Sequence, residues 1–92
     1  MYRIIDNRSS GKTSRLMLLA KENKGVIACS NPAAMREKAY AYGIVGIDFI
    51  SYYDLFQKQY ETSAPVFIDE IEQYVRYLTN NNLKGYTLSA ED

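Results

Sequence analysis

The sequence contains no histidine and a single cysteine. Without histidine, a histidine-ligated metal site and a Ser-His catalytic triad are both excluded. The one cysteine, Cys29, lies inside an apolar run, which predicts a core residue rather than half of a disulfide or a metal ligand. Several common catalytic and metal-binding classes are therefore removed before any motif is considered.

An excess of charge of one sign is also missing, because eleven Lys and Arg residues balance eleven Asp and Glu residues. A surface dedicated to coating DNA or RNA is not indicated by this balance. A local basic patch, and with it a nucleic-acid partner, stays open as an alternative.

Long hydrophobic runs are absent as well. The longest one near the start, residues 16–20, is far too short to span a membrane. Charged side chains at Arg3, Asp6 and Arg8 come before every apolar stretch, which is unlike a signal peptide. We therefore expect no membrane association and a cytoplasmic location.

Short β-rich runs divide the chain at regular intervals. Its length of 92 residues predicts one domain, residues 1–92. The core is expected to be thin, because a chain this short buries only about 60–65% of the surface exposed by its unfolded form. Five runs predict strands, at residues 2–6 (YRIID), 26–30 (VIACS), 47–51 (IDFIS), 65–69 (PVFID) and 85–88 (GYTL).

Helical patterns follow each of the first four predicted strands. Residues 13–23 carry apolar side chains at helical spacing, and Asn31 is placed to cap a second helix. A capping box that begins at Ser51 predicts a short third helix, to about residue 60. The fourth helix is indicated by the apolar stripe of Ile71, Tyr74, Val75 and Leu78.

This alternation determines the expected fold class. Strict β-α alternation with continuous apolar strands predicts a parallel sheet covered by helices. We therefore expect an α/β fold of three layers (αβα), in which a mostly parallel five-stranded sheet carries helices on both faces. Ligands of such sheets bind beyond the carboxyl ends of the strands, and both motifs described next fall at such ends.

The segment between the first predicted strand and helix, residues 6–13 (DNRSSGKT), is compatible with a phosphate-binding loop. It fits seven of the eight positions of the pattern G-x-x-x-x-G-K-[ST], with Asp6 in place of the first glycine. Gly11 would let the backbone approach a phosphate, Lys12 would reach the outer phosphates, and the Thr13 hydroxyl would ligate Mg²⁺. The alternative is a polar turn that caps a helix. The residues expected to contact the nucleotide are Ser9, Ser10, Gly11, Lys12, Thr13 and Ser14.

A second motif, residues 66–70 (VFIDE), is an apolar strand that ends in two carboxylates. Asp69 at this position would hold Mg²⁺, and Glu70 would accept a proton from the attacking water. The alternative is a pair of acids placed favourably in the first turn of a helix. Two motifs at the ends of two predicted parallel strands, in this chain order, favour the site.

With both motifs the chain resembles a minimal P-loop NTPase of the RecA-like branch, and within it the ATPase core of helicases and of phage terminase large subunits. The resemblance implies Mg²⁺ and ATP as ligands. For a phage or bacterial protein, the expected location is the cytoplasm of the bacterial host. Arg8 lies four residues before Lys12, where terminases place an arginine that stabilises charge on the transferred phosphoryl group. A solvent-facing loop arginine is the alternative.

The resemblance also assigns a role to the last predicted strand, residues 86–89. In this branch the corresponding strand lies between the strands that carry the two motifs, and its terminal polar residue senses the outer phosphate. Ser89 or Thr87 could take that role, although a plain strand end is the competing interpretation.

We therefore expect binding of a nucleoside triphosphate and slow Mg²⁺-dependent hydrolysis, with Glu70, Lys12 and Arg8 as catalytic residues. A minimal site is half open to water, so activity is expected to depend on self-assembly or a protein partner. The alternative is a non-catalytic P-loop-fold interaction module, such as a small phage-encoded inhibitor or assembly accessory protein. Asp6 favours this alternative, since an aspartate repels a polyphosphate. A nucleotide kinase is disfavoured because no arginine-rich lid segment is found.

Overall fold

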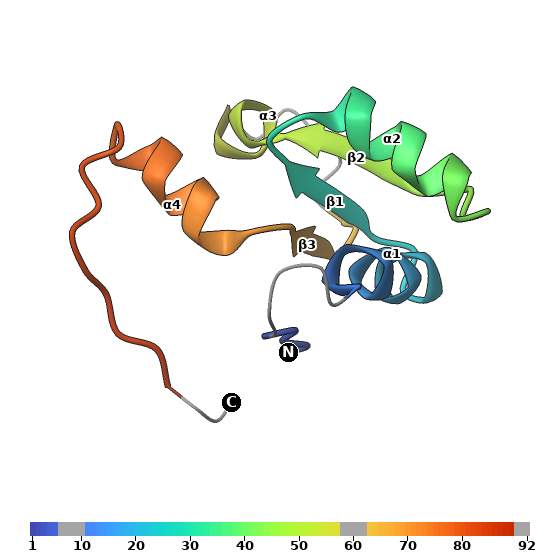
Figure 1. Ribbon diagram of the computed structural model, residues 1–92, viewed down its shortest axis with the longest axis horizontal. Helices are drawn as coiled ribbons and strands as arrows, with labels where there is room; N and C mark the ends of the chain where they lie inside the picture. Colours follow the sequence, from blue (N-terminus) through green and yellow to red (C-terminus); the bar gives the residue numbers. More distant parts are fainter. Residues whose placement is uncertain (6–10, 58–62, 90–92) are drawn as a thin grey trace.

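The computed structural model describes residues 1–5, 11–57 and 63–89 (Figure 1). Helices and strands alternate along these residues, as the sequence predicts. Their bounds are α1 Lys12–Glu22, β1 Val26–Cys29, α2 Pro32–Ala41, β2 Asp48–Ser51, α3 Tyr52–Gln57, β3 Val66–Ile68 and α4 Ile71–Leu78.

The three strands form one parallel sheet in the order β2-β1-β3. Val26 at the start of β1 lies opposite Asp48 of β2 and Val66 of β3, so the three strands begin and end at common edges. All four residues of β1 are buried, which explains its continuous apolar sequence: a central strand is covered on both faces and flanked on both sides.

The prediction of a five-stranded sheet is wrong. Within the described ranges the sheet has three strands, and neither residues 2–5 nor residues 85–88 form one. Strand propensity reports how well a side chain fits a half-buried surface, and these terminal segments lack such a surface. Ile5 is 81% exposed and Leu88 is 72% exposed.

The two terminal segments make side-chain contacts in place of strand pairing. The Tyr2 ring stacks on Phe67 of β3, with ring centroids 6.3 Å apart. The Arg3 guanidinium donates a hydrogen bond to the backbone oxygen of Ser89 at 3.0 Å. Figure 1 shows the chain beyond α4 as an irregular segment that returns towards the N-terminal end, outside the sheet.

A cluster of buried side chains lies on one face of the sheet. Alternation along β1 and β2 places Ile27, Cys29 and Phe49 on this face, where they meet side chains from α1 and α2. Small alanines on both helices allow the backbones to approach the sheet closely. The buried cluster consists of Met17, Ala20, Ile27, Cys29, Met35, Ala39, Ile44 and Phe49.

The predicted helix starts agree with the cap contacts. The Asn31 side chain accepts a hydrogen bond from the Ala34 N–H at 3.1 Å, and the Ser51 hydroxyl accepts one from the Asp54 N–H at 3.0 Å. Ser51 is the last residue of β2 and Asn31 lies two residues beyond β1, so the chain turns into a helix at the carboxyl edge of the sheet. Among the residues described, no helix combines the length and apolar character needed to cross a lipid bilayer.

Candidate functional site

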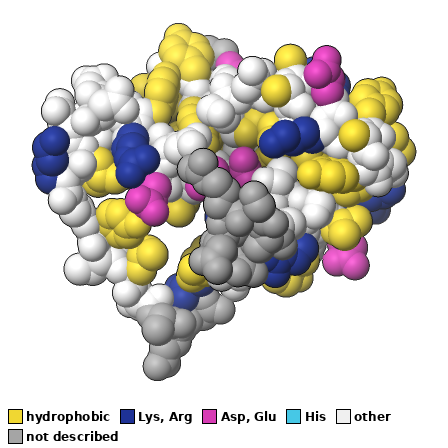
Figure 2. Space-filling model, viewed as in Figure 1, with side chains coloured by type: hydrophobic (Ala, Val, Ile, Leu, Met, Phe, Trp, Pro, Cys, Tyr) yellow, Lys and Arg dark blue, Asp and Glu magenta, His cyan; other side chains and the backbone are white. Residues whose placement is uncertain are grey.

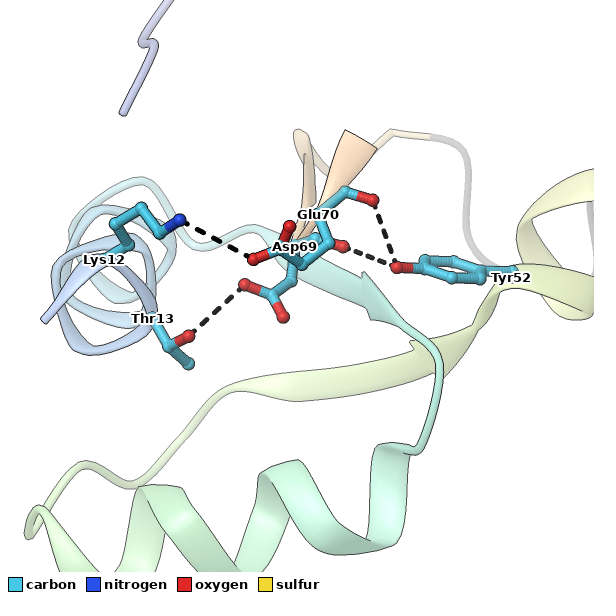
Figure 3. Close-up of polar contacts among 5 residues, drawn as sticks. All are labelled: Lys12, Thr13, Tyr52, Asp69 and Glu70. Carbon is cyan, nitrogen blue, oxygen red and sulfur yellow. Dashed lines mark hydrogen bonds and ion pairs between the residues drawn. The ribbon is translucent and has the colours of Figure 1, made fainter. Parts of the chain in front are cut away.

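The two sequence motifs lie next to each other at the carboxyl edge of the sheet, although 56 residues separate Thr13 from Asp69 in the chain. The Thr13 hydroxyl donates a hydrogen bond to Asp69 Oδ1 at 3.5 Å, and Lys12 Nζ lies 3.8 Å from Glu70 Oε1 (Figure 3). The structure therefore brings together four of the predicted site residues, two from each motif.

Gly11 caps α1 in a left-handed conformation, with φ 83° and ψ 19°. The first backbone bond of the helix joins the Arg15 N–H to the Gly11 oxygen at 3.1 Å. The preceding N–H groups, of Lys12, Thr13 and Ser14, therefore have no acceptor within the helix, as in the first turn of any α-helix. They present partial positive charge to an anion beyond the helix end. The Ser14 hydroxyl is turned back onto the Gly11 oxygen at 3.0 Å.

Asp69 follows β3 directly and is half-buried. Its N–H donates to the Ala28 oxygen at 3.0 Å, which extends the β1–β3 pairing by one residue. Burial raises the pKa of the Asp69 carboxyl above its ordinary value, and the charge of Glu70 adds to this increase. The Thr13 hydrogen bond and the charges of Lys38 and Lys12 oppose the increase. A cation that binds beside Asp69 would offset this cost of burying its charge.

Glu70 occupies the cap position of α4 with φ 61° and ψ 73°, a left-handed conformation. For a residue with a Cβ this conformation costs on the order of 1–2 kcal/mol. The carboxylate does not cap its own helix, as Asn31 and Ser51 side chains cap theirs. It points instead towards Lys12, the first residue of α1. The left-handed backbone of Glu70 therefore accompanies a side chain that is directed to the first motif.

Tyr52, which no local sequence pattern marks, joins this site from the other side. It is the first residue of α3, and its side chain is buried. Its hydroxyl donates to the backbone oxygen of Asp69 at 2.6 Å and lies 3.3 Å from that of Glu70. Burial raises the pKa of the Tyr52 hydroxyl, and the negative charge of Asp69 raises it further. Tyr52 and its neighbour Tyr53 cannot be told apart from the sequence pattern. Only the structure distinguishes them, because Tyr52 is buried and Tyr53 is exposed.

A cavity of about 430 Å³ opens between the N-terminal ends of α1 and α4 and the C-terminal part of α2. Its volume falls within the range of about 300–1,000 Å³ that is typical of small-molecule sites. Lys38, Tyr42 and Gln73 were not predicted, because nothing in their local sequence marks them. The cavity is lined by Gly11, Lys12, Thr13, Lys38, Tyr42, Glu70 and Gln73.

A larger cavity of about 770 Å³ lies between α3 and α4. Tyr52, Phe56 and Tyr77 are among its lining residues. Neither the described part of the phosphate loop, residues 11–13, nor the acidic pair lines it. We therefore place the candidate site in the smaller cavity. Side chains of both charges are interspersed on the face shown in Figure 2, with no continuous basic surface among those described there.

Several predicted site residues are not part of this geometry. Arg8, Ser9 and Ser10 lie outside the described residues, as does Asp6. Ser89 is described; it is exposed, belongs to no strand, and does not line the cavity. Its expected approach to the outer phosphate depended on a fifth strand between the two motifs, and that strand is absent from the sheet that the described residues form.

The oxygen atoms of Thr13 and Asp69 are the type of ligand that Mg²⁺ prefers. In the described part of the chain, no group of three or more histidine, cysteine, aspartate or glutamate residues could hold a metal ion. A cation at Thr13 and Asp69 would therefore need further oxygen ligands, and Mg²⁺ commonly takes these from water and from substrate phosphates.

Comparisons of the chain with protein-family models, with curated proteins and with solved structures gave no match. The candidate site therefore depends on its own geometry, and the resemblance to P-loop NTPases stays a prediction from the two motifs.

Proposed function

We propose that the cavity at the ends of α1, α2 and α4 binds the polyphosphate of a nucleoside triphosphate, with ATP as the expected nucleotide and Mg²⁺ as its companion ion. The main support is the contact between Thr13 and Asp69 beside the N-terminus of α1. It places a carboxylate suited to a cation beside Thr13, a cavity-lining residue at a helix end that is suited to phosphate.

Charge balance around the cavity supports a metal-bound nucleotide rather than a free anion. Lys12 and Lys38 supply two positive charges, while Asp69 and Glu70 supply two negative ones. Among these four described side chains a free polyphosphate would meet no net positive charge, and the two acids would repel it. A divalent cation held by Thr13 and Asp69 would remove that repulsion and offset charge on the phosphate oxygens.

The ion pair between Lys12 and Glu70 could be replaced when a nucleotide binds, with Lys12 exchanging Glu70 for a phosphate. The pair is long, at 3.8 Å, and its side chains are 28% and 48% exposed, so it is weak and easily replaced. A phosphate that takes Lys12 would leave the Glu70 carboxylate free. That carboxylate could then accept a proton from an attacking water molecule, the role of a general base.

Hydrolysis by one copy of the chain is expected to be slow, because transition-state charge is stabilised best in a site that excludes water. Activity should therefore increase when a second copy or another protein closes the cavity. The test is the specific hydrolysis rate as a function of protein concentration. A fast rate that stays constant on dilution would contradict this dependence.

Binding is tested by calorimetric titration with Mg-ATP and Mg-GTP of the wild type and of the Lys12→Ala variant. Loss of one charge-assisted contact is expected to raise Kd by about 10- to 100-fold. Lys21→Ala is the matched control, since Lys21 is an exposed lysine on the same helix, away from the cavity. Absence of binding by the wild type would refute the proposed function.

A non-catalytic interaction module is the second candidate, and α4 is the observation that favours it. This helix has no fully buried residue, and the apolar side chains of Ile71 and Leu78 are 50% and 43% exposed. Residues seven apart share one face of a helix, and apolar side chains that are exposed together on one face are a feature of surfaces that bind a partner. Glu70→Gln separates the two candidates: turnover lost with binding retained supports catalysis, whereas a wild type that binds without turnover supports the module.

A further inference from the structure

Tyr52 connects the two outer strands of the sheet. It lies directly after β2, whereas the backbone oxygen that accepts its hydrogen bond belongs to Asp69, directly after β3. The strand order β2-β1-β3 places the whole of β1 between them. Neighbouring strands are about 4.7–4.9 Å apart, so only a long side chain can cross this gap. Figure 3 shows the ring of Tyr52 extending towards Asp69 and Glu70.

The contact holds the backbone of the acidic turn, not its carboxylates. The Asp69 N–H is bonded to the Ala28 oxygen of β1 at 3.0 Å, and the Asp69 oxygen is bonded to Tyr52 at 2.6 Å. Asp69 is therefore held on both sides of its Cα atom, by Ala28 of β1 and by Tyr52, which directly follows β2. The next residue, Glu70, has the left-handed backbone with φ 61°. The turn would relax readily from this strained conformation without such an anchor.

The ring of Tyr52 is itself fixed. Its centroid lies 5.4 Å from that of Tyr74 and 6.4 Å from that of Tyr77, both on α4. The side chain is 6% exposed, so the hydroxyl has a defined position rather than a range of solvent-exposed rotamers. A rigid donor of this kind can set the direction of the peptide group that it binds.

We propose that Tyr52 is a positioning residue, whose hydroxyl fixes the Asp69–Glu70 backbone so that one carboxylate meets Thr13 and the other meets Lys12. The consequence for metal and nucleotide rests on the proposed function, whereas the consequence for the backbone does not. Removing the hydroxyl should loosen the turn and leave the ring packing in place.

The first experiment uses the nucleotide-free chain. Tyr52→Phe removes only the hydroxyl, and Tyr53→Phe is the matched control because Tyr53 is the adjacent residue and is 51% exposed. Amide hydrogen exchange is measured by NMR at Asp69, Gln73 and Tyr74, whose N–H groups bond to the Ala28 and Glu70 oxygens. Tyr52→Phe is expected to accelerate their exchange by roughly tenfold, the effect of one lost hydrogen bond.

Unchanged exchange at the three amides in Tyr52→Phe would overturn the proposal. So would equal acceleration at every amide of the β1–β2 pair, because that result indicates general destabilisation. Should the variant fail to fold, the wild type still provides a test. A slowly exchanging Tyr52 hydroxyl proton with a nuclear Overhauser contact to Glu70 is expected, and a freely exchanging one would refute the anchor.

The second experiment measures nucleotide turnover as a function of Mg²⁺ concentration. Tyr52→Phe is expected to lower kcat and to raise the Mg²⁺ concentration needed for half-maximal rate, each by roughly tenfold, with little change in KM for the nucleotide. A wild type without binding refutes the proposed function, and the exchange experiment then decides the positioning role alone. A wild type that turns over at the same rate as Tyr52→Phe refutes the positioning role alone.

Discussion

Replacing Gly11 by alanine separates the stability of the α1 cap from its role in phosphate binding. A Cβ atom at Gly11 would lie 3.6 Å from Ser14 Oγ, an ordinary contact, so space is not the obstacle. The obstacle is φ 83°, a conformation that costs an alanine about 1–2 kcal/mol. The unfolded chain also becomes less flexible, which returns about 0.4–1 kcal/mol. The backbone penalty exceeds this gain, and we expect a net loss of about 1 kcal/mol.

The expected decrease in Tm is about 4–8 °C per kcal/mol for a domain of this size. Gly46→Ala is the matched control, because Gly46 has nearly the same φ of 85°, open space around its Cβ position, and no place in the cavity lining. It should lose similar stability. Gly85→Ala, where φ is not left-handed and space is open, should lose none.

Thermal unfolding and Mg-ATP titration of the three variants provide the assay. Gly11→Ala and Gly46→Ala should melt at similar temperatures, but only Gly11→Ala should bind the nucleotide more weakly. If Gly11→Ala melts like Gly85→Ala, the left-handed cap does not carry the strain assigned to it. If it binds like Gly46→Ala, the N-terminus of α1 is not the phosphate site.

Three further predictions concern the charges around the cavity and the buried thiol. Lys38→Ala should weaken Mg-ATP binding severalfold in a titration while Lys38→Arg retains it, because the positive charge of Lys38 lines the cavity. Equal affinity of the two variants would exclude a role for the Lys38 charge in binding. Asp69→Asn should raise Tm at neutral pH. Burial raises the pKa of this carboxyl, so its ionised form destabilises the free protein. The same substitution should remove the Mg²⁺ dependence of nucleotide binding. A lower Tm would show that the charge of Asp69 stabilises the fold. Burial raises the pKa of the Cys29 thiol to about 11 from an ordinary 9.0, so a disulfide reagent at pH 8 should modify the native chain far more slowly than the denatured one. The unfolded thiol ionises first as the pH rises, so urea denaturation should give a lower free energy of unfolding above about pH 9; a free energy that rises there would contradict the burial of Cys29.

The candidate site was predictable where its signals are local. The cap at Gly11, the lysine and threonine after it, and the acids that follow β3 lie within short segments. The residue types in these segments have direct chemical reasons. Their proximity could be inferred only from the assumption that parallel strands share a carboxyl edge. The register of Val26 with Val66 agrees with that assumption for β1 and β3.

Tyr52, Lys38 and Gln73 could not be found in this way. Each lies on a helix whose local pattern gives no functional signal, and each reaches the site only because of how the helices pack. Tyr52 is the clearest case, since its partner Asp69 is 17 residues away along the chain and the central strand lies between them in the sheet.

The sequence by itself determined the helix caps, the alternation of helices with strands and the apolar central strand, because these depend on interactions over a few residues. Tertiary structure alone decided the width of the sheet and the composition of the cavity. Residues 2–5 and 85–88 have strand-like sequences, yet a strand also needs a partner and a covered face. The contacts of Lys12 with Glu70 and of Tyr52 with Asp69 likewise depend on packing between distant segments, which no local pattern encodes.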